Sequence, residues 1–296
     1  MDASDLTGRT ILVTGANAGI GYWCVEQLAA RGARVLLGCR SPQRAGRAVD
    51  AVRSQVPDAD LRVVGLDLGS LESVAAAASG IDERLDAVIC NAGVKAADRA
   101  ARTSDGLDLM VGTNFLGHFA LIAQLDAALA ADARIVAVGS LAHRFATIDP
   151  VTLDQPWHGT SLRQYGRSKA ALMAFAFELD RRWSGSERSA VCAHPGYAVD
   201  PLTAQRPGVS EVAAPIRALA AVTRVLVQGK DDGALPIVHA ATAADVVSGD
   251  YWGPGGLAEF RGRPARVTAS DQVRSASVGR ELWAVAEQLT GVTFPA

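Results

Sequence analysis

The sequence predicts an α/β domain built on one doubly wound, mostly parallel sheet. Two observations lead to this prediction. Short apolar runs alternate with helical patterns along the chain, and polar or glycine-containing motifs stand directly after several of these runs. Alternation at this spacing implies parallel strands joined by right-handed crossovers. Because ligands bind outside the carboxyl ends of such strands, we expect the motifs to share one rim of the sheet.

The composition is that of an ordinary globular chain. Its 296 residues are 49% hydrophobic and 20% charged, with a formal net charge of −2. This charge gives no reason to expect nucleic acid or an anionic membrane as partner. The polar segment Met1 to Thr10 is unlike a signal peptide, and no apolar run of about 18 residues predicts a membrane span. The four cysteines stand singly in apolar stretches. We therefore expect reduced core thiols, no metal site and a cytoplasmic location.

The first expected strand, Arg9 to Thr14, leads into a glycine-rich turn and then a helix. This is the opening of a nucleotide-binding βαβ unit, because glycines let the backbone turn sharply and approach a pyrophosphate. The N–H groups at the helix start then face the negative charge. A glycine-rich turn without a ligand is the alternative. The turn residues expected to bind are Gly15, Asn17, Gly19, Ile20 and Gly21.

Further strands and helices follow in alternation. The strands are expected over Arg34 to Cys39, Leu61 to Leu66, Leu85 to Cys90, Arg134 to Val138 and Ser189 to Ala193. The helices are expected over Gln43 to Gln55, Leu107 to Ala131 and from the region of Tyr165 to Trp183. The motifs at the strand ends are Cys39-Arg40, Asp67-Leu68, Asn91-Ala92-Gly93, Ser140 and Pro195-Gly196. Their convergence on one rim outweighs any single motif.

Tyr165 and Lys169 are four residues apart, so a helix would place both on one face. A free phenol has a pKa near ~10, and a neighbouring ammonium can lower it by roughly 1–3 units. Tyr165 would then be suited to general acid/base catalysis near neutral pH. The alternative is a helix that carries the two side chains by coincidence.

Taken together, these residues resemble the short-chain dehydrogenase/reductase family over about residues 8 to 200. The motifs behind the resemblance are Thr14-Gly-x-x-x-Gly-x-Gly21, Asn91-Ala-Gly93, Asn114, Ser140, Tyr165-x-x-x-Lys169 and Pro195-Gly196. Other segments are similar to the retinol-dehydrogenase-like branch. They are Asn114-x-Leu-Gly-His-Phe119, Ser140-x-Ala-His143 and Tyr251-Trp-Gly-Pro-Gly-Gly256.

The resemblance implies a Rossmann-type, mostly parallel sheet of seven strands and an oxidoreductase site. Tyr165 would be the acid/base, Ser140 would hold the reacting oxygen, and Lys169 would grip the nicotinamide ribose. Asn114 would bend the long helix and anchor a water, and Asp67 would face the adenine. The implied cofactor-binding set is completed by Leu68, Asn91, Ala92, Gly93, Tyr165, Lys169, Pro195 and Gly196.

Some of these residues have alternative interpretations. Ser140 could be a strand-end turn residue, Asn114 a solvated polar position and Asp67 a helix N-cap. The whole protein could be a nicotinamide-binding sensor or scaffold without catalysis. The presence of all four expected catalytic residues, Asn114, Ser140, Tyr165 and Lys169, argues against this. One departure from the family is Asp200, which stands where a threonine usually holds the nicotinamide carboxamide.

The residues at the end of the second expected strand indicate which nicotinamide cofactor binds. An acidic residue at its end selects NAD by accepting the ribose hydroxyls. Here neutral Cys39 occupies that place and Arg40 follows, and arginine can pair with a 2′-phosphate. NADP(H) is therefore expected, with NAD(H) as the alternative and a solvated arginine as the other interpretation of Arg40.

We expect residues 1–296 to form one domain, with a substrate lid at about 201–244 and a C-terminal segment at about 249–296. Leu141, Phe145, Tyr197 and Leu202 predict an apolar pocket for a bulky hydrophobic alcohol or carbonyl. The helices over 107–131 and 168–183 carry apolar residues on more than one face. Such a surplus usually packs against a partner, so a homodimer or homotetramer is expected.

Overall fold

Across residues 5–295, which the computed structural model describes, eight strands form one sheet in the order β3-β2-β1-β4-β5-β6-β7-β8. All neighbouring pairs are parallel except β7 with β8. The strands are β1 (Thr10–Thr14), β2 (Arg34–Cys39), β3 (Leu61–Gly65), β4 (Leu85–Cys90), β5 (Leu129–Val138), β6 (Ser189–Ala193), β7 (Tyr251–Pro254) and β8 (Pro264–Arg266). The predicted fold class is confirmed. The strand count of seven is wrong by one, because the short antiparallel edge strand β8 has no periodic apolar pattern.

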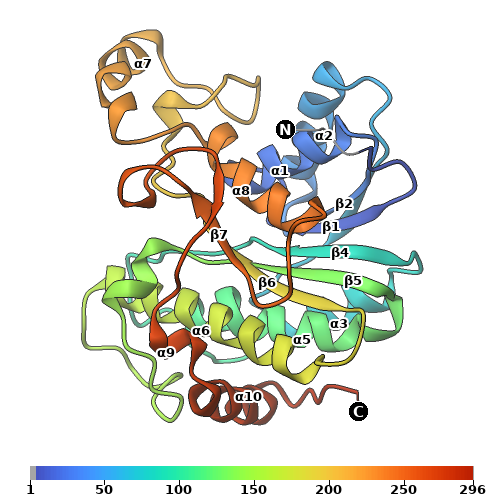
Figure 1. Ribbon diagram of the computed structural model, residues 1–296, viewed down its shortest axis with the longest axis vertical. Helices are drawn as coiled ribbons and strands as arrows, with labels where there is room; N and C mark the ends of the chain where they lie inside the picture. The colour runs from blue at the N-terminus through green and yellow to red at the C-terminus, as the bar shows by residue number, and fades with distance from the viewer. Residues whose placement is uncertain (1–4, 296) are drawn as a thin grey trace.

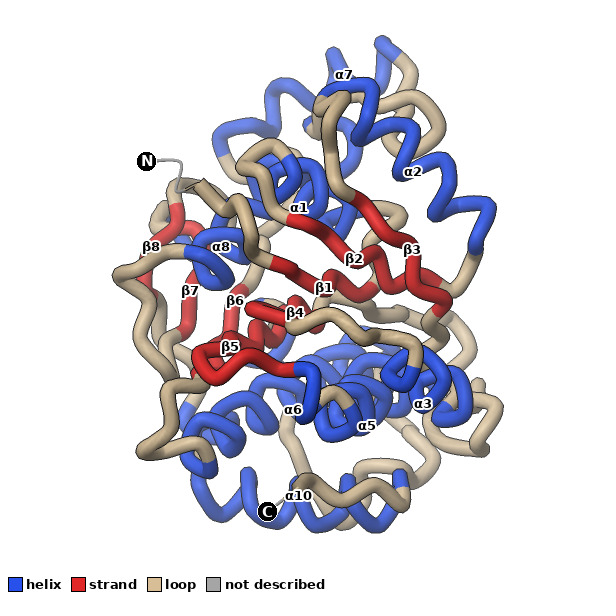
Figure 2. The backbone as a smooth tube through the Cα atoms, turned by 90° about the vertical axis from the view of Figure 1, so that its right-hand side faces the viewer, coloured by secondary structure: helices blue, strands red, loops and turns tan. Residues whose placement is uncertain are grey.

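Helices cover both faces of this sheet (Figures 1 and 2). Helices α1, α2 and α8 lie on one face, and α3, α5 and α6 lie on the other, with α10 outside them. The α-helices are α1 (Gly19–Ala29), α2 (Pro42–Gln55), α3 (Leu71–Ser79), α4 (Leu109–Val111), α5 (Gly117–Gln124), α6 (Ser161–Arg182), α7 (Ala214–Ala220), α8 (Lys230–Thr242), α9 (Asp271–Arg274) and α10 (Ala276–Thr290).

The central strands are buried from both sides. Leu12 packs into the core under α3, α5 and α6, whereas its neighbours Ile11 and Val13 pack into the core under α1, α2 and α8. Successive side chains of a strand point to opposite faces, so a strand covered on both sides reads as a continuous apolar run. The chain runs outward from β1 to β3 and returns to β4 beside β1. This reversal creates the crevice in which such sheets bind ligands.

The long helix expected over 107–131 is wrong in its extent. It is divided into α4, a π-helical turn η1 (Gly112–Leu116) and α5, and a 3₁₀ turn η2 (Asp126–Ala128) follows. Residues 129–131 belong to β5, where Leu129 pairs with Leu85 of β4. Alanine-rich sequence favours a helix, but pairing with a buried strand overrides that weak local preference.

The C-terminal segment covers the helices that were expected to face a partner. Trp283 of α10 lies 5.2 Å from the ring of Phe119 in α5 and 5.7 Å from Phe175 in α6, centroid to centroid. Phe294 lies 5.1 Å from Phe119. The apolar surplus of α5 and α6 is therefore buried inside the chain, at least in part.

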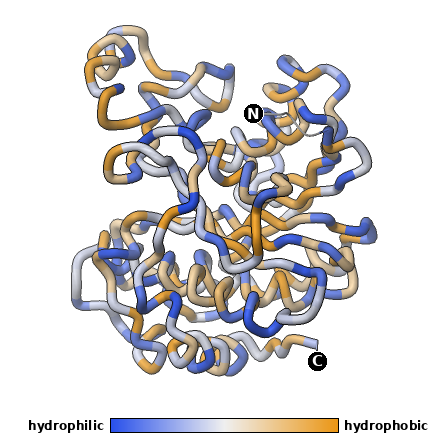
Figure 3. Tube along the Cα trace, in the orientation of Figure 1, coloured by the Kyte–Doolittle hydropathy of each residue, from blue (hydrophilic) through white to orange (hydrophobic). Residues whose placement is uncertain are grey.

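The lid region contains η4 (Asp200–Leu202), α7, η5 (Ala221–Val225) and the start of α8. The segment 214–226 has no buried residue, and apolar side chains such as Leu219 and Val222 are more than three-quarters exposed. Figure 3 shows this apolar segment around α7, away from the sheet. None of the helices described between residues 5 and 295 is long and apolar enough to cross a bilayer. The expectation for Met1 to Thr10 lies partly outside the described residues.

Candidate active site

The glycine-rich turn connects β1 to α1 at the rim of the sheet. Gly15 and Gly19 adopt left-handed backbone conformations, with φ of 65° and 58°. A side-chain carbon at Gly15 would lie 2.9 Å from Ala92 Cα, and one at Gly21 would collide with the carbonyl oxygen of Gly15. No side chain caps the N-terminus of α1. The turn is thus an open cradle of backbone N–H groups, a suitable anion site.

The end of β4 is tied to this turn. Thr14 Oγ1 accepts hydrogen bonds from the N–H groups of Asn91 (3.0 Å) and Ala92 (2.9 Å). In return, Asn91 Nδ2 donates to the carbonyl oxygen of Thr14 at 2.8 Å. Gly93 continues the same floor, and an added methyl group there would lie 3.2 Å from Lys169 Nζ. The predicted motifs at the ends of β1 and β4 therefore form one continuous surface.

Asn114 lies in the π-helical turn and is fully buried. Its Oδ1 accepts from the N–H of Val94 at 2.7 Å, and its Nδ2 donates to the Val94 carbonyl at 3.0 Å and to Ser168 Oγ at 2.8 Å. The alternative of a solvated polar position is wrong. π-turns inside helices commonly occur at functional sites, and this one fastens the chain after β4 to helix α6.

Helix α6 carries Tyr165 and Lys169 into the same region. Lys169 is buried, and its ammonium donates to the carbonyl oxygen of Val138 at 2.9 Å. Burial lowers the pKa of Lys169 to about 8. The ammonium therefore lies near the end of β5, beside Gly93.

The expected lowering of the Tyr165 pKa is wrong. Burial raises the pKa of Tyr165, and the hydrogen bond with Ser140 opposes this only in part. Lys169 does not act on the phenol because its ammonium is directed to the Val138 carbonyl. Ser140 Oγ also accepts from the N–H of Ala142 at 3.2 Å, so the residue is both a turn residue and the partner of Tyr165.

Arg40 and Asp67 lie beside each other at the ends of β2 and β3. The Arg40 side chain is 72% exposed, and its Nη1 lies 3.9 Å from Asp67 Oδ2. Asp67 Oδ1 accepts from the N–H of Gly69 at 2.9 Å, whereas Ser70 caps α3, so the N-cap alternative for Asp67 is wrong. The Leu68 side chain is buried in the core.

Comparisons with known proteins identify the family. A family profile described as short chain dehydrogenase matches residues 9–207. The chain belongs to the short-chain dehydrogenase family. It is 33% identical to human retinol dehydrogenase 13 over 98% of this chain and 87% of that protein. It is also 32% identical to mouse retinol dehydrogenase 14 over 98% of this chain and 88% of that protein. The expected NAD(P)-dependent oxidoreductase of the retinol-dehydrogenase-like branch is confirmed.

Solved structures share this fold. A crystal structure of an uncharacterized Mycobacterium paratuberculosis protein has a TM-score of 0.81 and 32% identity, covering 100% of this chain and 98% of that one. A short chain dehydrogenase from Burkholderia cenocepacia in complex with NADP has a TM-score of 0.62 and 24% identity, covering 84% and 97%. The second likeness shows the fold alone.

The Pro195-Gly196 turn of this dehydrogenase follows β6, and Gly196 has a φ of 66°. Beyond it, Asp200 forms an ion pair with Lys230, with 2.6 Å between Oδ1 and Nζ. Asp200 was recognisable in the sequence as a departure from the family pattern, whereas Lys230 was not. Local pattern gives no signal for this lysine, because the packing of α8 against α1 brings it to the rim.

Three histidines of the dehydrogenase near this rim are engaged in structural hydrogen bonds. His118 lies between the Asn114 carbonyl and Thr14 Oγ1, at 3.1 and 2.9 Å. His143 Nδ1 lies 2.7 Å from the Ser140 carbonyl oxygen, and His194 Nε2 lies 3.1 Å from Glu259 Oε2. Burial lowers the pKa of all three. Each ring therefore favours its neutral form, as expected for structural rather than acid/base roles.

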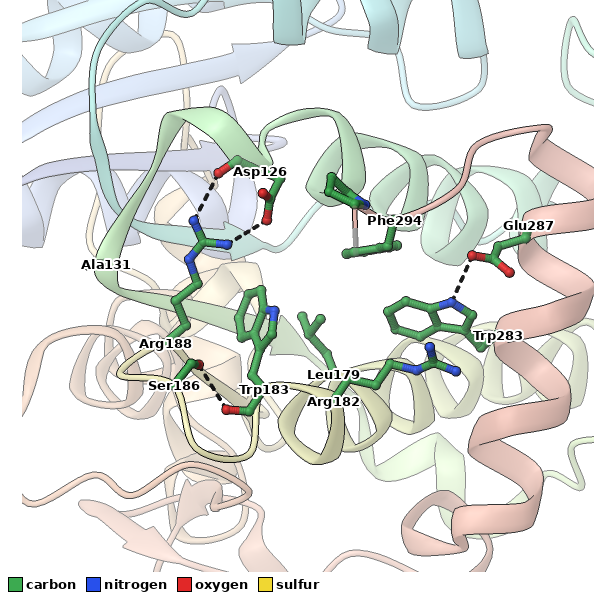
Figure 4. A pocket seen from close by; sticks show the side chains of 11 residues that line it. Asp126, Ala131, Leu179, Arg182, Trp183, Ser186, Arg188, Trp283, Glu287 and Phe294 are labelled. Atoms are coloured by element: carbon green, nitrogen blue, oxygen red, sulfur yellow. Dashed lines mark hydrogen bonds and ion pairs between the residues drawn. The ribbon is translucent and has the colours of Figure 1, made fainter.

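A pocket of about 530 Å³ lies away from this site, between α6, α10 and the C-terminal tail (Figure 4). Its polar side chains are already engaged. Arg188 pairs with Asp126 at 2.5 Å, and Trp283 Nε1 donates to Glu287 at 3.1 Å. None of the motif residues described above lines this pocket.

Proposed function

We propose that this dehydrogenase transfers a hydride between NADP(H) and a bulky hydrophobic alcohol or carbonyl compound, with Tyr165 as the acid/base. The observation that carries the proposal is the convergence of Tyr165, Ser140, Lys169 and Asn114 beside the open glycine-rich turn. Side-chain carbons at Gly15 and Gly21 would collide with the backbone of Ala92 and of Gly15, so these glycines permit the tight turn. The turn leaves the first N–H groups of α1 without a side-chain cap, which fits a dinucleotide pyrophosphate.

When bound, the nicotinamide supplies or receives the hydride, and the protein provides placement and proton transfer. Because burial raises its pKa, the Tyr165 phenol keeps its proton at neutral pH. In this proposal the phenol acts as the general acid toward a carbonyl oxygen, and Ser140 holds that oxygen beside it. Lys169, with a pKa of about 8, can carry or release a proton near neutral pH. Asn114 fixes the floor below it through Val94.

Arg40 supports the preference for the phosphorylated cofactor. Its guanidinium is exposed at the end of β2, and Cys39 replaces the carboxylate that would select NAD. Burial raises the pKa of the Cys39 thiol to about 11. The thiol therefore stays neutral and adds no negative charge at the end of β2. NAD(H) is the alternative cofactor.

Exposed apolar side chains support the proposal that the substrate is hydrophobic. Phe145 is 70% exposed and Tyr197 is 56% exposed, with Phe260 6.1 Å from the Tyr197 ring. Leu202, in contrast, is buried. The names of the relatives, retinol dehydrogenases 13 and 14, point to the same class of bulky apolar alcohols.

The test has two stages. Cofactor binding is followed by the fluorescence of NADPH and NADH, and turnover is then measured with a panel of hydrophobic aldehydes, ketones and alcohols. Binding with turnover of bulky apolar compounds supports the proposal. Binding without turnover on any compound would favour a nicotinamide-binding sensor or scaffold. A preference for small charged hydroxy acids would contradict the substrate class.

We further propose that residues 1–296 act as one domain in the cytoplasm and assemble as a homodimer or homotetramer. Four free cysteines support the reducing compartment. Because α10 covers α5 and α6, the interface would include other apolar surface, and the exposed residues of 214–226 offer it. Light scattering that shows only monomer at micromolar concentration would contradict the assembly.

A further inference from the structure

Lys230 is the first residue of α8, and its side chain lies beside the glycine-rich turn. Its ammonium is 2.6 Å from Asp200 Oδ1 and 4.0 Å from the point that a side-chain carbon at Gly19 would occupy. Gly19 opens α1, whose first N–H groups have no side-chain cap. A positive charge thus lies next to the open anion cradle, in addition to the backbone groups that form it.

The backbone that carries this lysine is held in place. The N–H of Lys230 donates to Thr203 Oγ1 at 2.9 Å, and Thr203 Oγ1 donates to the Val199 carbonyl at 2.8 Å. One residue further, the Asp231 carbonyl accepts from Gln27 Nε2 of α1 at 2.8 Å. Helix α8 is therefore fastened to both α1 and the segment after β6, and the lysine side chain is three-quarters buried.

The ion pair alone does not account for a lysine at this position. Asp200 is 56% exposed, and exposed ion pairs contribute little to stability. A free carboxylate beside a phosphate site would, however, repel the ligand. Lys230 neutralises that carboxylate while keeping further donors for an anion, because an ammonium has three N–H groups.

We propose that Lys230 is an additional ligand of the cofactor's pyrophosphate and that Asp200 positions its ammonium beside the glycine-rich turn. This inference rests on the proposed cofactor function and goes beyond it, since it assigns a phosphate ligand to α8. Lysine commonly binds phosphate as a point charge. Asp200 orients the ammonium through one of its N–H groups, and the others would contact phosphate when the cofactor binds.

The first test separates the pyrophosphate from the rest of the cofactor. Lys230→Ala should weaken NADPH binding by about tenfold, the lower end for one charge-assisted contact. ADP, which carries a pyrophosphate, should weaken similarly, whereas adenosine 2′-monophosphate should bind as to the wild type. Calorimetry or fluorescence gives each Kd without turnover. Lys230→Arg should keep most of the affinity, and Arg53→Ala, an exposed charge near the end of α2, should change nothing.

The second test asks whether Lys230 contacts phosphate or only neutralises Asp200. Removing Lys230 from the wild type also leaves Asp200 unpaired, so the effect of Lys230→Ala is measured again in an Asp200→Asn background. A direct phosphate contact predicts that a loss of several-fold persists there. A lysine that only neutralises the carboxylate would lose its effect entirely, and that result would overturn the inference.

These outcomes are distinguishable from failure of the proposed function. Wild-type protein that binds NADPH and turns over substrate, with an unchanged Kd in Lys230→Ala, refutes the lysine contact and leaves the function standing. Wild-type protein that binds no dinucleotide refutes both. Equal weakening of ADP and adenosine 2′-monophosphate would show a general disturbance of the fold rather than a pyrophosphate contact, and would also overturn the inference.

Discussion

Asn114 Nδ2 donates a hydrogen bond of 2.8 Å to Ser168 Oγ, which joins the π-helical turn to the helix that carries Tyr165 and Lys169. Ser168 Oγ in turn donates to the Tyr165 carbonyl oxygen at 2.8 Å. Asn114 also makes two hydrogen bonds to the backbone of Val94, directly after the floor of the site. One amide therefore aligns the floor of the site with the acid/base helix.

Ser168→Ala tests this alignment. The substitution removes one buried hydrogen-bond partner of Asn114, so we expect the free energy of unfolding to fall by about 1 kcal/mol. Turnover should fall only a few-fold, because the two bonds to Val94 still hold the amide. Urea unfolding and steady-state kinetics measure the two effects. Ser79→Ala, which affects an exposed hydroxyl bonded within its own helix, is a matched control. A fall in turnover much larger than a few-fold, with a free energy of unfolding close to that of the wild type, would assign Ser168 a role in the reaction.

Tyr165→Phe tests the acid/base. It removes the proton donor and keeps the ring, so cofactor binding should survive while turnover falls roughly 10²–10⁴-fold. NADPH fluorescence and kcat are measured on the same sample. Tyr251→Phe is the control, because this tyrosine belongs to β7 and its hydroxyl has no partner among the described residues. Turnover within a few-fold of wild type in Tyr165→Phe would reject the assignment.

We also predict the effect of Tyr251→Phe on the stability of the protein. Tyr251 is 2% exposed, and its hydroxyl is buried without a hydrogen bond in the described part of the chain. A buried unpaired polar group costs about 1–3 kcal/mol relative to its solvated state. Tyr251→Phe should therefore raise the free energy of unfolding by about 1 kcal/mol, measured in urea. A loss of stability would indicate that the hydroxyl has a partner, such as a bound water.

Arg40→Ala tests cofactor selection. A charge-assisted contact to the 2′-phosphate is worth about 1.5–3 kcal/mol, so the Kd for NADP(H) should rise about tenfold to a hundredfold. The Kd for NAD(H) in the same variant is the internal control and should hardly change. Asp67→Asn should tighten NADP(H), because Asp67 Oδ2 lies 3.9 Å from the guanidinium and competes with the phosphate for it. A preference that survives Arg40→Ala would show that another group reads the phosphate.

Strands with continuous apolar runs were predictable from the sequence, whereas the middle of the chain was not. The bounds of β2, β4 and β6 match the expected ranges because these strands are buried on both faces. The prediction of one helix over 107–131 was wrong because the composition of this stretch favours a helix throughout. It gives no indication of the π-turn at Asn114 or of the start of β5 at Leu129. Both features depend on tertiary contacts, which local periodicity does not contain.

The residues of the candidate site likewise include some that were predictable from the sequence and some that were not. Residues at strand ends, such as Ser140 and Gly93, follow from the topology of a parallel sheet. The direction of the Tyr165 pKa was wrong because helical spacing places Lys169 on the right face but does not show that its ammonium bonds Val138. Lys230 was missed because its position depends on how α8 packs, far along the chain from the turn it approaches.

The buried histidines predict how stability depends on pH, and His118 makes the clearest case. Burial and the nearby Lys169 charge lower the pKa of His118 from 6.5 to about 3. Between these values the unfolded chain binds a proton that the folded chain does not bind. The free energy of unfolding therefore falls as pH falls below about 6.5, with a slope approaching 1.4 kcal/mol per pH unit for this one group.

His118→Asn tests this origin. The variant should be less stable at pH 7.5, because Thr14 Oγ1 loses its contact with the ring nitrogen. Its loss of stability between pH 7.5 and 5.5 should, however, be smaller than that of the wild type by about 1.4 kcal/mol. Urea unfolding at the two pH values measures the difference, and His158→Asn, in the loop before α6, should keep the wild-type dependence. An unchanged pH dependence in His118→Asn would mean that the other buried histidines, His143 and His194, account for the acid sensitivity.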